Sequence, residues 1–342
     1  MFKKIVRLFK KIALWFFIIS IASVVFFKWV PIPFTPLMIT RALEQKFEAI
    51  NQKIETHLEG LLWAKPITYW DYIQTDALLN LQTQRTVLPD EMVFIMYHQV
   101  NELLFKMILW ETQQLCHTQH PETVFFTEKL KRISRYFNML TTSFDIMGDG
   151  MEVDQYMKFR NTLTPASGFQ SAQYRTIELF ATEFNYLVHP EHRARFNSES
   201  NLDEMYQHIY WKTGATELGS GKKTYTLQQF EEQYDTTLLA TAKTMKGKTI
   251  GSIASRLFDG DADIQKQLRF FDLNVNVNWP LAHYKTAVKY LQRDPETIAA
   301  TGGTNWQKYL PPRFQKRIFY PTLWSAQEIE EWGKAWVEEA RA

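Results

Sequence analysis

Apolar side chains recur at helical spacing along most of the chain. Residues 90–115, DEMVFIMYHQVNELLFKMILWETQQL, contain no glycine or proline and place apolar residues three and four positions apart, the pattern of a helix with one buried face. The same period continues in TEKLKRISRYFNMLTTSFDIM (127–147), AQYRTIELFATEFNYLV (172–188) and WPLAHYKTAVKYLQ (279–292). Strand-like alternation is almost absent. The pattern therefore predicts an all-α fold.

Breaks in this pattern divide the chain into three predicted parts. Prolines interrupt it between Pro31 and Pro36, and the polar, amphipathic stretch 37–62 reads as a linker helix. A Gly-rich loop or insertion lies near Gly214–Gly221. We expect a basic head and transmembrane helix over 1–31, a linker helix over 32–65 and one all-α domain over 66–342.

The N-terminus predicts a single membrane anchor. A basic head with Lys3, Arg7 and Lys11 precedes the uncharged run Ile12–Phe27, which approaches the ~20 apolar residues of a spanning helix. The positive-inside rule would place the first residues in the cytoplasm and the body beyond the membrane. WVPIPFTPLMITRALEQ (29–45) resembles the anchor and neck of monofunctional peptidoglycan glycosyltransferases, but no catalytic part of such an enzyme follows.

Composition narrows the possible chemistry. The 342 residues include 39 basic and 37 acidic side chains, for a net charge of +2, and no basic domain stands out, so nucleic acid is not an expected partner. The single cysteine, Cys116, excludes an internal disulfide framework and a cysteine-built metal site. The eight histidines are therefore the main candidates for metal or proton chemistry.

Two pairs of residues share a helix face at a separation of four. Phe94 and His98 form one pair, and Tyr156 and Arg160 form the other. A histidine beside a phenylalanine is most often core packing. Arg160 comes just before the helix-breaking TPASG (164–168), where its planar fork suits capture of a carboxylate, with a solvated helix end as the alternative. Tyr156 could add a hydroxyl to the same anion.

His283 is a further candidate ligand. It lies in NWPLAHYKTAV (278–288), with Pro280 in the predicted first turn and small or apolar neighbours. Such a histidine is either a core residue or a proximal haem ligand. ATGGTNW (300–306) reads as a flexible loop that closes over a ligand, or as an ordinary helix terminator. CHTQHP (116–121) reads as a helix end rather than a metal site.

Taken in order, several motifs resemble those of tryptophan 2,3-dioxygenases. They are YWDYIQTDALLNLQ (69–82), DEMVFIMYHQVNELLFKMI (90–108), FRNTLTPASGFQSAQYR (159–175), and WPLAH (279–283) followed by TGG (301–303). The resemblance spans roughly 66–321. It implies an all-α helical haem-dioxygenase bundle, here preceded by one N-terminal transmembrane helix. The closing loop departs from the family's Gly-Thr-Gly-Gly-Ser-Ser-Gly at Thr304–Trp306, and RDPETIAA (293–300) lengthens the interval before it.

The resemblance also implies roles for individual residues. His283 matches the proximal haem-iron ligand, and His98 matches the distal histidine that bonds the indole N–H. The other matched positions are Phe94 in the pocket wall, Tyr156 and Arg160 as carboxylate binders, Thr301 as the contact to the substrate's ammonium and carboxylate, and Tyr69, Tyr72 and Ile73 as a segment that completes a neighbouring subunit's pocket. A homotetramer is implied by that last match.

The implied activity is oxidative cleavage of the indole C2–C3 bond of L-tryptophan to N-formylkynurenine, in tryptophan catabolism by the kynurenine pathway. It requires haem b with ferrous iron, and O2 as co-substrate. A membrane-tethered haem sensor or carrier without turnover, or a haem enzyme acting on another indole, remains the alternative. Because the family works in the cytosol, we expect the anchor to have been joined to an otherwise soluble enzyme, with the catalytic domain facing the cytoplasm.

Overall fold

The computed structural model describes residues 10–12, 14–20, 41, 43–53, 60, 67–163, 166, 168–216, 222–293, 296–297, 307 and 310–334. The chain forms two compact units, Met1–Leu79 and Asn80–Ala342. Each unit is considered by itself.

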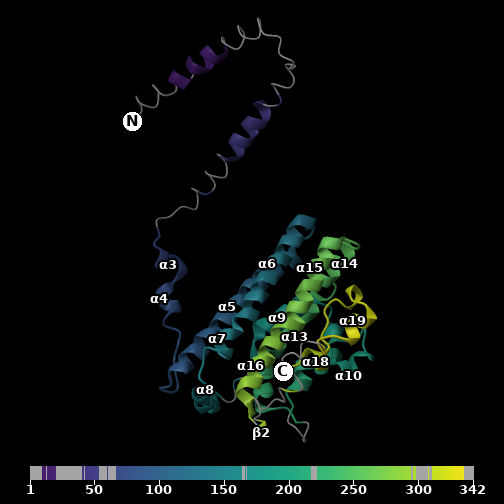
Figure 1. Ribbon diagram of the computed structural model, residues 1–342. Coiled ribbons are helices and arrows are strands. Elements are labelled where there is room, and N and C mark those ends of the chain that lie inside the picture. Colours follow the sequence, from purple (N-terminus) through teal and green to yellow (C-terminus); the bar gives the residue numbers. More distant parts are fainter. Residues whose placement is uncertain are drawn as a thin grey trace. The chain divides into compact units, whose positions relative to one another are not determined.

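In the first unit, the described residues are mostly helical and none is buried. Helices α3 (Tyr69–Ile73) and α4 (Thr75–Leu78) are its labelled elements (Figure 1). Thr68 caps α3 because its side-chain oxygen accepts a hydrogen bond from the backbone N–H of Asp71, 3.3 Å away. Gln74 ends the helix in the left-handed conformation, with φ of 57°, so the chain turns before α4 begins.

No helix in the described residues is long and apolar enough to cross a membrane. Of the predicted span Ile12–Phe27, Ile12 and residues 14–20 are described and helical. Ala13 and residues 21–27 lie outside the described residues. The described residues therefore do not support the predicted transmembrane helix, which stays a prediction from sequence.

The second unit is a helical bundle, which confirms the all-α fold. Its α-helices are α5 (Pro89–His117), α6 (Thr123–Thr142), α7 (Phe144–Gly148), α8 (Val153–Phe159), α9 (Ala172–Ala181), α10 (Pro190–Arg193), α11 (Leu202–Gln207), α12 (Tyr210–Gly214), α13 (Tyr225–Met245), α14 (Ile250–Leu257), α15 (Ala262–Leu273), α16 (Trp279–Leu291), α18 (Pro312–Gln315) and α19 (Ala326–Glu330). Shorter helical turns are η1 (Arg160–Leu163), η2 (Gly168–Gln170), η3 (Phe184–Leu187) and η5 (Pro321–Leu323), and a π-helix, η4 (Asn274–Asn278), joins α15 to α16.

A small hairpin follows α16. Strands β1 (Gln292–Arg293) and β2 (Glu296–Thr297) pair antiparallel, with Gln292 opposite Thr297 and Arg293 opposite Glu296. The hairpin occupies the interval that the sequence shows as lengthened before the Thr301 loop. No strand was predicted there, because two-residue strands carry no periodic signal.

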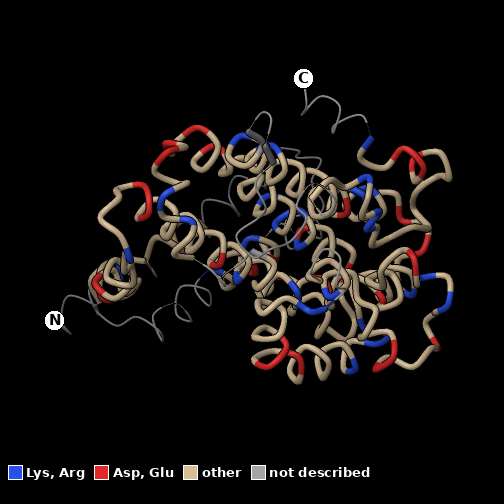
Figure 2. Tube along the Cα trace, turned by 90° about the horizontal axis from the view of Figure 1, so that it is seen from below, with Lys and Arg blue, Asp and Glu red and all other residues tan. Residues whose placement is uncertain are grey.

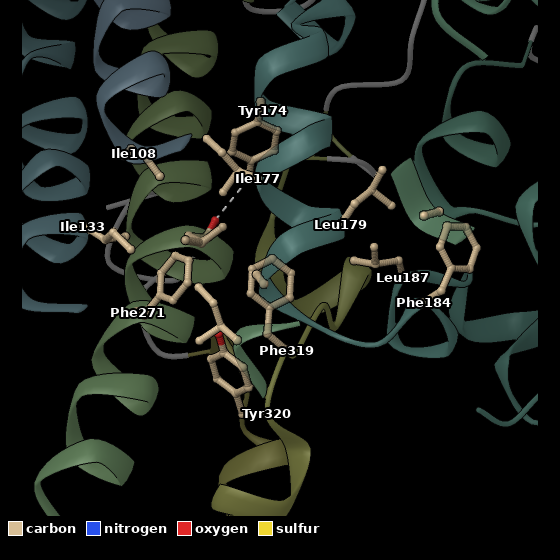
Figure 3. Packing of buried hydrophobic residues seen from close by; sticks show 14 of the residues in the cluster. Ile108, Ile133, Tyr174, Ile177, Leu179, Phe184, Leu187, Phe271, Phe319 and Tyr320 are labelled. Carbon is tan, nitrogen blue, oxygen red and sulfur yellow. Dashed lines mark hydrogen bonds between the residues drawn. The ribbon is translucent and has the colours of Figure 1, made fainter. Parts of the chain in front are cut away.

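Helices α5, α6, α9 and α15 form a large part of the core of the second unit. Helix α5 starts with Pro89 in its first turn and runs for 29 residues, since no later glycine or proline interrupts it. It packs against α6 and α9, and α6 packs against α15 (Figure 1). Ile108, Ile133 and Phe271, one from each of α5, α6 and α15, are fully buried where these helices meet (Figure 3). Burial of such side chains stabilises the fold by about 1.5–3 kcal/mol each.

Asp272 ties the C-terminal part of this unit to α15. Its completely buried carboxylate accepts hydrogen bonds from the backbone N–H groups of Phe319 (2.9 Å) and Tyr320 (3.2 Å), from the indole N–H of Trp324 (2.9 Å), and from the Asn276 amide (2.8 Å). Burial raises the pKa of Asp272 to about 6, although these hydrogen bonds act in the opposite direction.

Charged residues of both signs are interspersed along the described trace (Figure 2). The net charge of +2 is therefore the difference between two distributed populations rather than the mark of one basic element.

Candidate functional site

Helix α5 carries Phe94 and His98 on one face, as their spacing predicts. The two ring centroids lie 4.1 Å apart, and Nδ1 of His98 lies 2.7 Å from the Phe94 carbonyl oxygen. A carbonyl can only accept a hydrogen bond, so Nδ1 carries the proton and Nε2 keeps its lone pair. His98 has an exposed surface, yet enough protein surrounds the ring that burial lowers its pKa. The imidazole is therefore neutral near pH 7, with Nε2 as an acceptor.

His283 lies in the second turn of α16, near the same end of the bundle. Burial and, to a smaller extent, the neighbouring His98 together lower the pKa of His283 to about 4, so His98 lies close enough to act electrostatically on this imidazole. The His283 ring stacks on Phe144 of α7, with centroids 5.5 Å apart and planes at 21°. Among the described residues, no hydrogen bond reaches this ring, which is free to act as a neutral nitrogen ligand.

Aromatic rings connect the two histidines. Tyr97 meets His98 edge-on at 5.5 Å and lies 5.8 Å from Phe144, which in turn stacks on His283. Tyr97 and Phe144 are both buried. Neither residue was predicted from sequence, although Tyr97 adjoins His98 and Phe144 opens the FDIM segment after α6. Which way they point depends on how α7 packs between α5 and α16, and helical spacing within one segment does not specify that.

Tyr156 lies within α8 beside these aromatic rings, and Arg160 follows at the C-terminal end of the helix. The Tyr156 ring lies 6.2 Å from that of Phe94 and 4.7 Å from that of Tyr290. Arg160 is the C-cap residue of α8, and its backbone N–H donates to the Tyr156 carbonyl oxygen. Only 6% of Arg160 is exposed, so the alternative of a solvated helix end does not hold. A guanidinium buried this deeply is suited to an anionic partner.

Hydrogen bonds from two arginines fix the backbone on both sides of the helix-breaking segment 164–168. On the near side, Arg85 donates to the carbonyl oxygen of Thr162 at 2.6 Å. On the far side, Nε of Arg175 donates to the Phe169 carbonyl at 3.2 Å, and the same guanidinium pairs with the buried Glu178 at 2.8 Å. No role for Arg175 was predicted from sequence, because its contact with Tyr210 comes from α12, although Glu178 lies three residues on in the same helix.

Glu178 is the centre of a buried polar cluster that includes Arg175. It accepts from Arg175 and, at 2.7 Å, from Arg317, and Tyr210 donates to it at 2.5 Å. Two arginines, one carboxylate and one phenol thus join α9, α12 and the C-terminal segment. Removing Glu178 would leave two buried cations unpaired, a costly change.

The remaining predicted site residues lie elsewhere in the chain. Tyr69, Tyr72 and Ile73 lie in α3 of the first unit, where they are 71%, 74% and 39% exposed. Thr301 and Thr304–Trp306 lie outside the described residues.

Metal-binding potential at this end of the bundle rests on the two histidines. Within the described ranges, no group of three or more His, Cys, Asp or Glu side chains could hold a metal ion. A multi-ligand cage is thus not the arrangement seen there, whereas a single neutral imidazole is what a haem iron takes from a protein on its proximal side.

Comparison with known proteins identifies the family. Residues 60–259 match the family described as tryptophan 2,3-dioxygenase, a range that includes Phe94, His98, Tyr156 and Arg160. The chain belongs to the tryptophan 2,3-dioxygenase family. The resemblance seen in the motifs is thereby confirmed.

Individual relatives extend the similarity beyond the matched range. A tryptophan 2,3-dioxygenase from Herpetosiphon aurantiacus is 29% identical over 274 residues, covering 77% of this chain and 98% of that protein. One from Bacillus thuringiensis is 28% identical over 277 residues, or 76% of this chain and 92% of that protein. One from Ruegeria sp. is 40% identical over 117 residues, or 34% and 42% of the two chains.

Proposed function

We propose that this chain is a haem-dependent dioxygenase that cleaves the indole C2–C3 bond of L-tryptophan and yields N-formylkynurenine, as in the kynurenine pathway. One observation carries the proposal. Two neutral imidazoles lie at one end of the bundle, with His98 close enough to His283 to lower its pKa and with Phe144 and Tyr97 between their rings. Phe94 lies against His98, and the buried Arg160 caps α8 one turn after Tyr156; an aromatic ring and a guanidinium can bind the two ends of an aromatic amino acid.

The described residues fit haem b. His283 would hold the iron, because its imidazole is neutral, its ring plane is set by Phe144, and no hydrogen bond from a described residue occupies it. When bound, the haem supplies a ferrous iron at which O2 is activated. What the protein itself contributes is binding, orientation and proton control.

His98 is suited to the indole N–H of tryptophan. Its Nδ1–H is engaged by the Phe94 carbonyl at 2.7 Å, so Nε2 is the nitrogen left to accept. Phe94, whose ring lies 4.1 Å from that of His98 at a tilt of 37°, would lie against the flat indole ring. A neutral His98 either holds the N–H as a hydrogen-bond acceptor or removes its proton as a base.

Arg160 is suited to the substrate carboxylate. A guanidinium forms two parallel hydrogen bonds with a carboxylate, and at 6% exposure little water competes for them. The Tyr156 hydroxyl, one turn earlier on α8, would donate to the same group. Thr301, in the loop predicted from sequence over 300–306, is proposed to contact the substrate's ammonium and carboxylate. Fixing both ends of tryptophan can supply on the order of 7–11 kcal/mol of barrier lowering.

A homotetramer completes the proposal. Tyr69, Tyr72 and Ile73 on α3 would enter a neighbouring subunit's pocket. Their exposure in a single chain supports this role, because two aromatic residues and an isoleucine side by side on a surface are typical of a contact site.

The test is a spectrum followed by an assay. Purified full-length protein is expected to show a haem Soret band that shifts when L-tryptophan is added, and N-formylkynurenine is expected to accumulate by absorbance under O2. A Soret band that responds to tryptophan without product would favour a sensor or carrier. Turnover of another indole in preference to tryptophan would favour the related-enzyme alternative.

A further inference from the structure

A second concave region shares no lining residue with the candidate site. It lies where η3, α14, the first turns of α15 and the segment 319–323 meet, and its volume is about 320 Å³. That size falls at the lower end of the range for small-molecule pockets. Its apolar wall consists mainly of Tyr186, Phe258, Leu268, Phe319, Tyr320 and Leu323.

The wall formed by Phe319 and Tyr320 is rigidly held. Both backbone N–H groups donate to Asp272, and the Phe319 carbonyl accepts from the Thr182 hydroxyl at 2.6 Å. Their rings pack against Phe271 in the core (Figure 3). Gly251 lets Tyr320 come close, because a Cβ there would lie 3.2 Å from Tyr320 Cε1. The pocket is therefore formed before any ligand arrives.

Two carboxylates line the pocket, and no lysine or arginine does. Oε1 of Glu183 accepts from the Gly247 N–H (3.1 Å), the Thr249 hydroxyl (3.2 Å) and the Ser252 hydroxyl. These bonds fix the carboxylate and leave Oε2 without a donor among the described residues. Asp259, exposed at the end of α14, likewise has no ion pair in the described part of the chain.

Two buried glutamates of this unit are paired with cations. Glu111 pairs with Lys129 at 2.5 Å, and Glu178 pairs with two arginines. The half-buried Glu183 is held by neutral donors instead, as the buried Asp272 is, and has no ion pair with a described residue. A fixed, unneutralised carboxylate beside an apolar wall attracts a cation that also has an apolar surface.

We infer that this pocket binds a small organic ammonium ion without a carboxylate. The ammonium group would lie between Glu183 Oε2 and Asp259, and the apolar body against Phe258 and Leu268. An amino acid is disfavoured, because its carboxylate would find no cation in the lining and two like charges nearby. The inference goes beyond the proposed dioxygenase activity and does not depend on it, since the two sites share no residue.

Calorimetric titration of the full-length, haem-loaded protein tests the inference. The probe is 2-phenylethylammonium, compared with 2-phenylethanol and 3-phenylpropanoate, each in the presence of saturating L-tryptophan to fill the candidate active site. We expect the ammonium ion to bind about tenfold or more tightly than the alcohol, the difference of one charge-assisted hydrogen bond, and the carboxylate to bind least. Equal binding of the ammonium ion and the alcohol would overturn the inference.

Matched variants locate the site. Glu183→Gln and Asp259→Asn are each expected to weaken the probe about tenfold, whereas Glu204→Gln, the same charge change on the exposed side of α11, is expected to leave binding unchanged. Because Glu183 also holds the 247–252 segment, its variant is paired with a melting curve, and Asp259→Asn, which breaks no described hydrogen bond, serves as the independent check. Wild-type affinity in both pocket variants would also overturn the inference.

Discussion

At the residue scale, the proposed function depends on what burial does to single side chains. A histidine with a lowered pKa keeps a lone pair for a metal or a proton, and an arginine removed from water binds a carboxylate more strongly than one in solvent. His283 and Arg160 show these two effects in this chain. Each effect can be removed by one substitution.

His283→Ala is expected to abolish the haem Soret band of the purified protein, because the proposed axial ligand is gone. The control is His117→Ala: His117 is exposed at the end of α5 and faces the Phe180 ring, so the band is expected to persist there. Pyridine haemochrome quantification gives the haem content of both variants. Full haem content in His283→Ala would show that another residue holds the iron.

Arg160→Lys is expected to lower kcat/KM for L-tryptophan. The lost transition-state stabilisation is expected to be about 2–5 kcal/mol, since a point charge cannot reproduce two parallel hydrogen bonds to a carboxylate. Steady-state kinetics gives this loss, and tryptamine, which lacks the carboxylate, provides the control substrate. The variant is expected to bind the two molecules almost equally, whereas the wild type prefers tryptophan. A wild type that fails to distinguish them would remove the carboxylate role from Arg160.

At the scale of elements, the sequence predicted what periodicity can encode. The long helices α5, α6, α9 and α16 follow from apolar spacing, and Phe94 shares a face with His98 as expected. The π-helix η4 does not follow, because NVNVN alternates as a strand would, yet Asn274–Val277 are all buried. The side-chain amides of Asn276 and Asn278 donate to side chains four residues earlier, those of Asp272 and Asn274 respectively.

Asp272 gives this junction a pH dependence. Its pKa rises from 3.8 to about 6 in the folded protein, so the folded state holds this proton more tightly than the unfolded state. The resulting stabilisation is complete below pH 3.8 and is lost as the pH rises through 6, amounting to about 3 kcal/mol. We therefore expect the stability advantage of the wild type over Asp272→Asn to shrink between pH 4 and pH 7.

Urea unfolding at several pH values measures that advantage. Comparison with the variant cancels the opposite trend of His283, whose lowered pKa makes the folded state less stable as the pH falls below 6.5. A wild-type advantage that grows with pH would mean that Asp272 is held as a carboxylate by its four hydrogen bonds, and that burial is the smaller influence.

At the scale of the whole molecule, the two units differ in what they contribute. Every buried apolar residue of the described chain lies between Tyr97 and Trp332, and none lies in the first unit. The second unit therefore carries the hydrophobic core. The first unit carries the exposed α3 residues proposed to complete a neighbour's pocket and the segment predicted from sequence as an anchor.

Two truncations separate these contributions. A chain starting at Lys46 lacks the predicted anchor and keeps α3, so we expect it to remain soluble without detergent, tetrameric and haem-loaded, with a melting temperature close to that of the full-length chain. A chain starting at Asn80 keeps the described core and loses Tyr69, Tyr72 and Ile73. Its helicity is expected to persist while the tetramer and the turnover of tryptophan are lost.

Light scattering, the Soret band and N-formylkynurenine formation measure these outcomes, and protease protection of the full-length chain in spheroplasts measures its topology. The cytoplasmic-facing body that we expect is resistant to protease added outside. The Lys46 chain differs from the full chain only by residues 1–45. If this chain is inactive and external protease digests the body of the full-length chain, the N-terminal segment is a working anchor that exports the enzyme. Full activity in the Asn80 chain would instead show that each subunit's pocket is complete without its neighbour's α3.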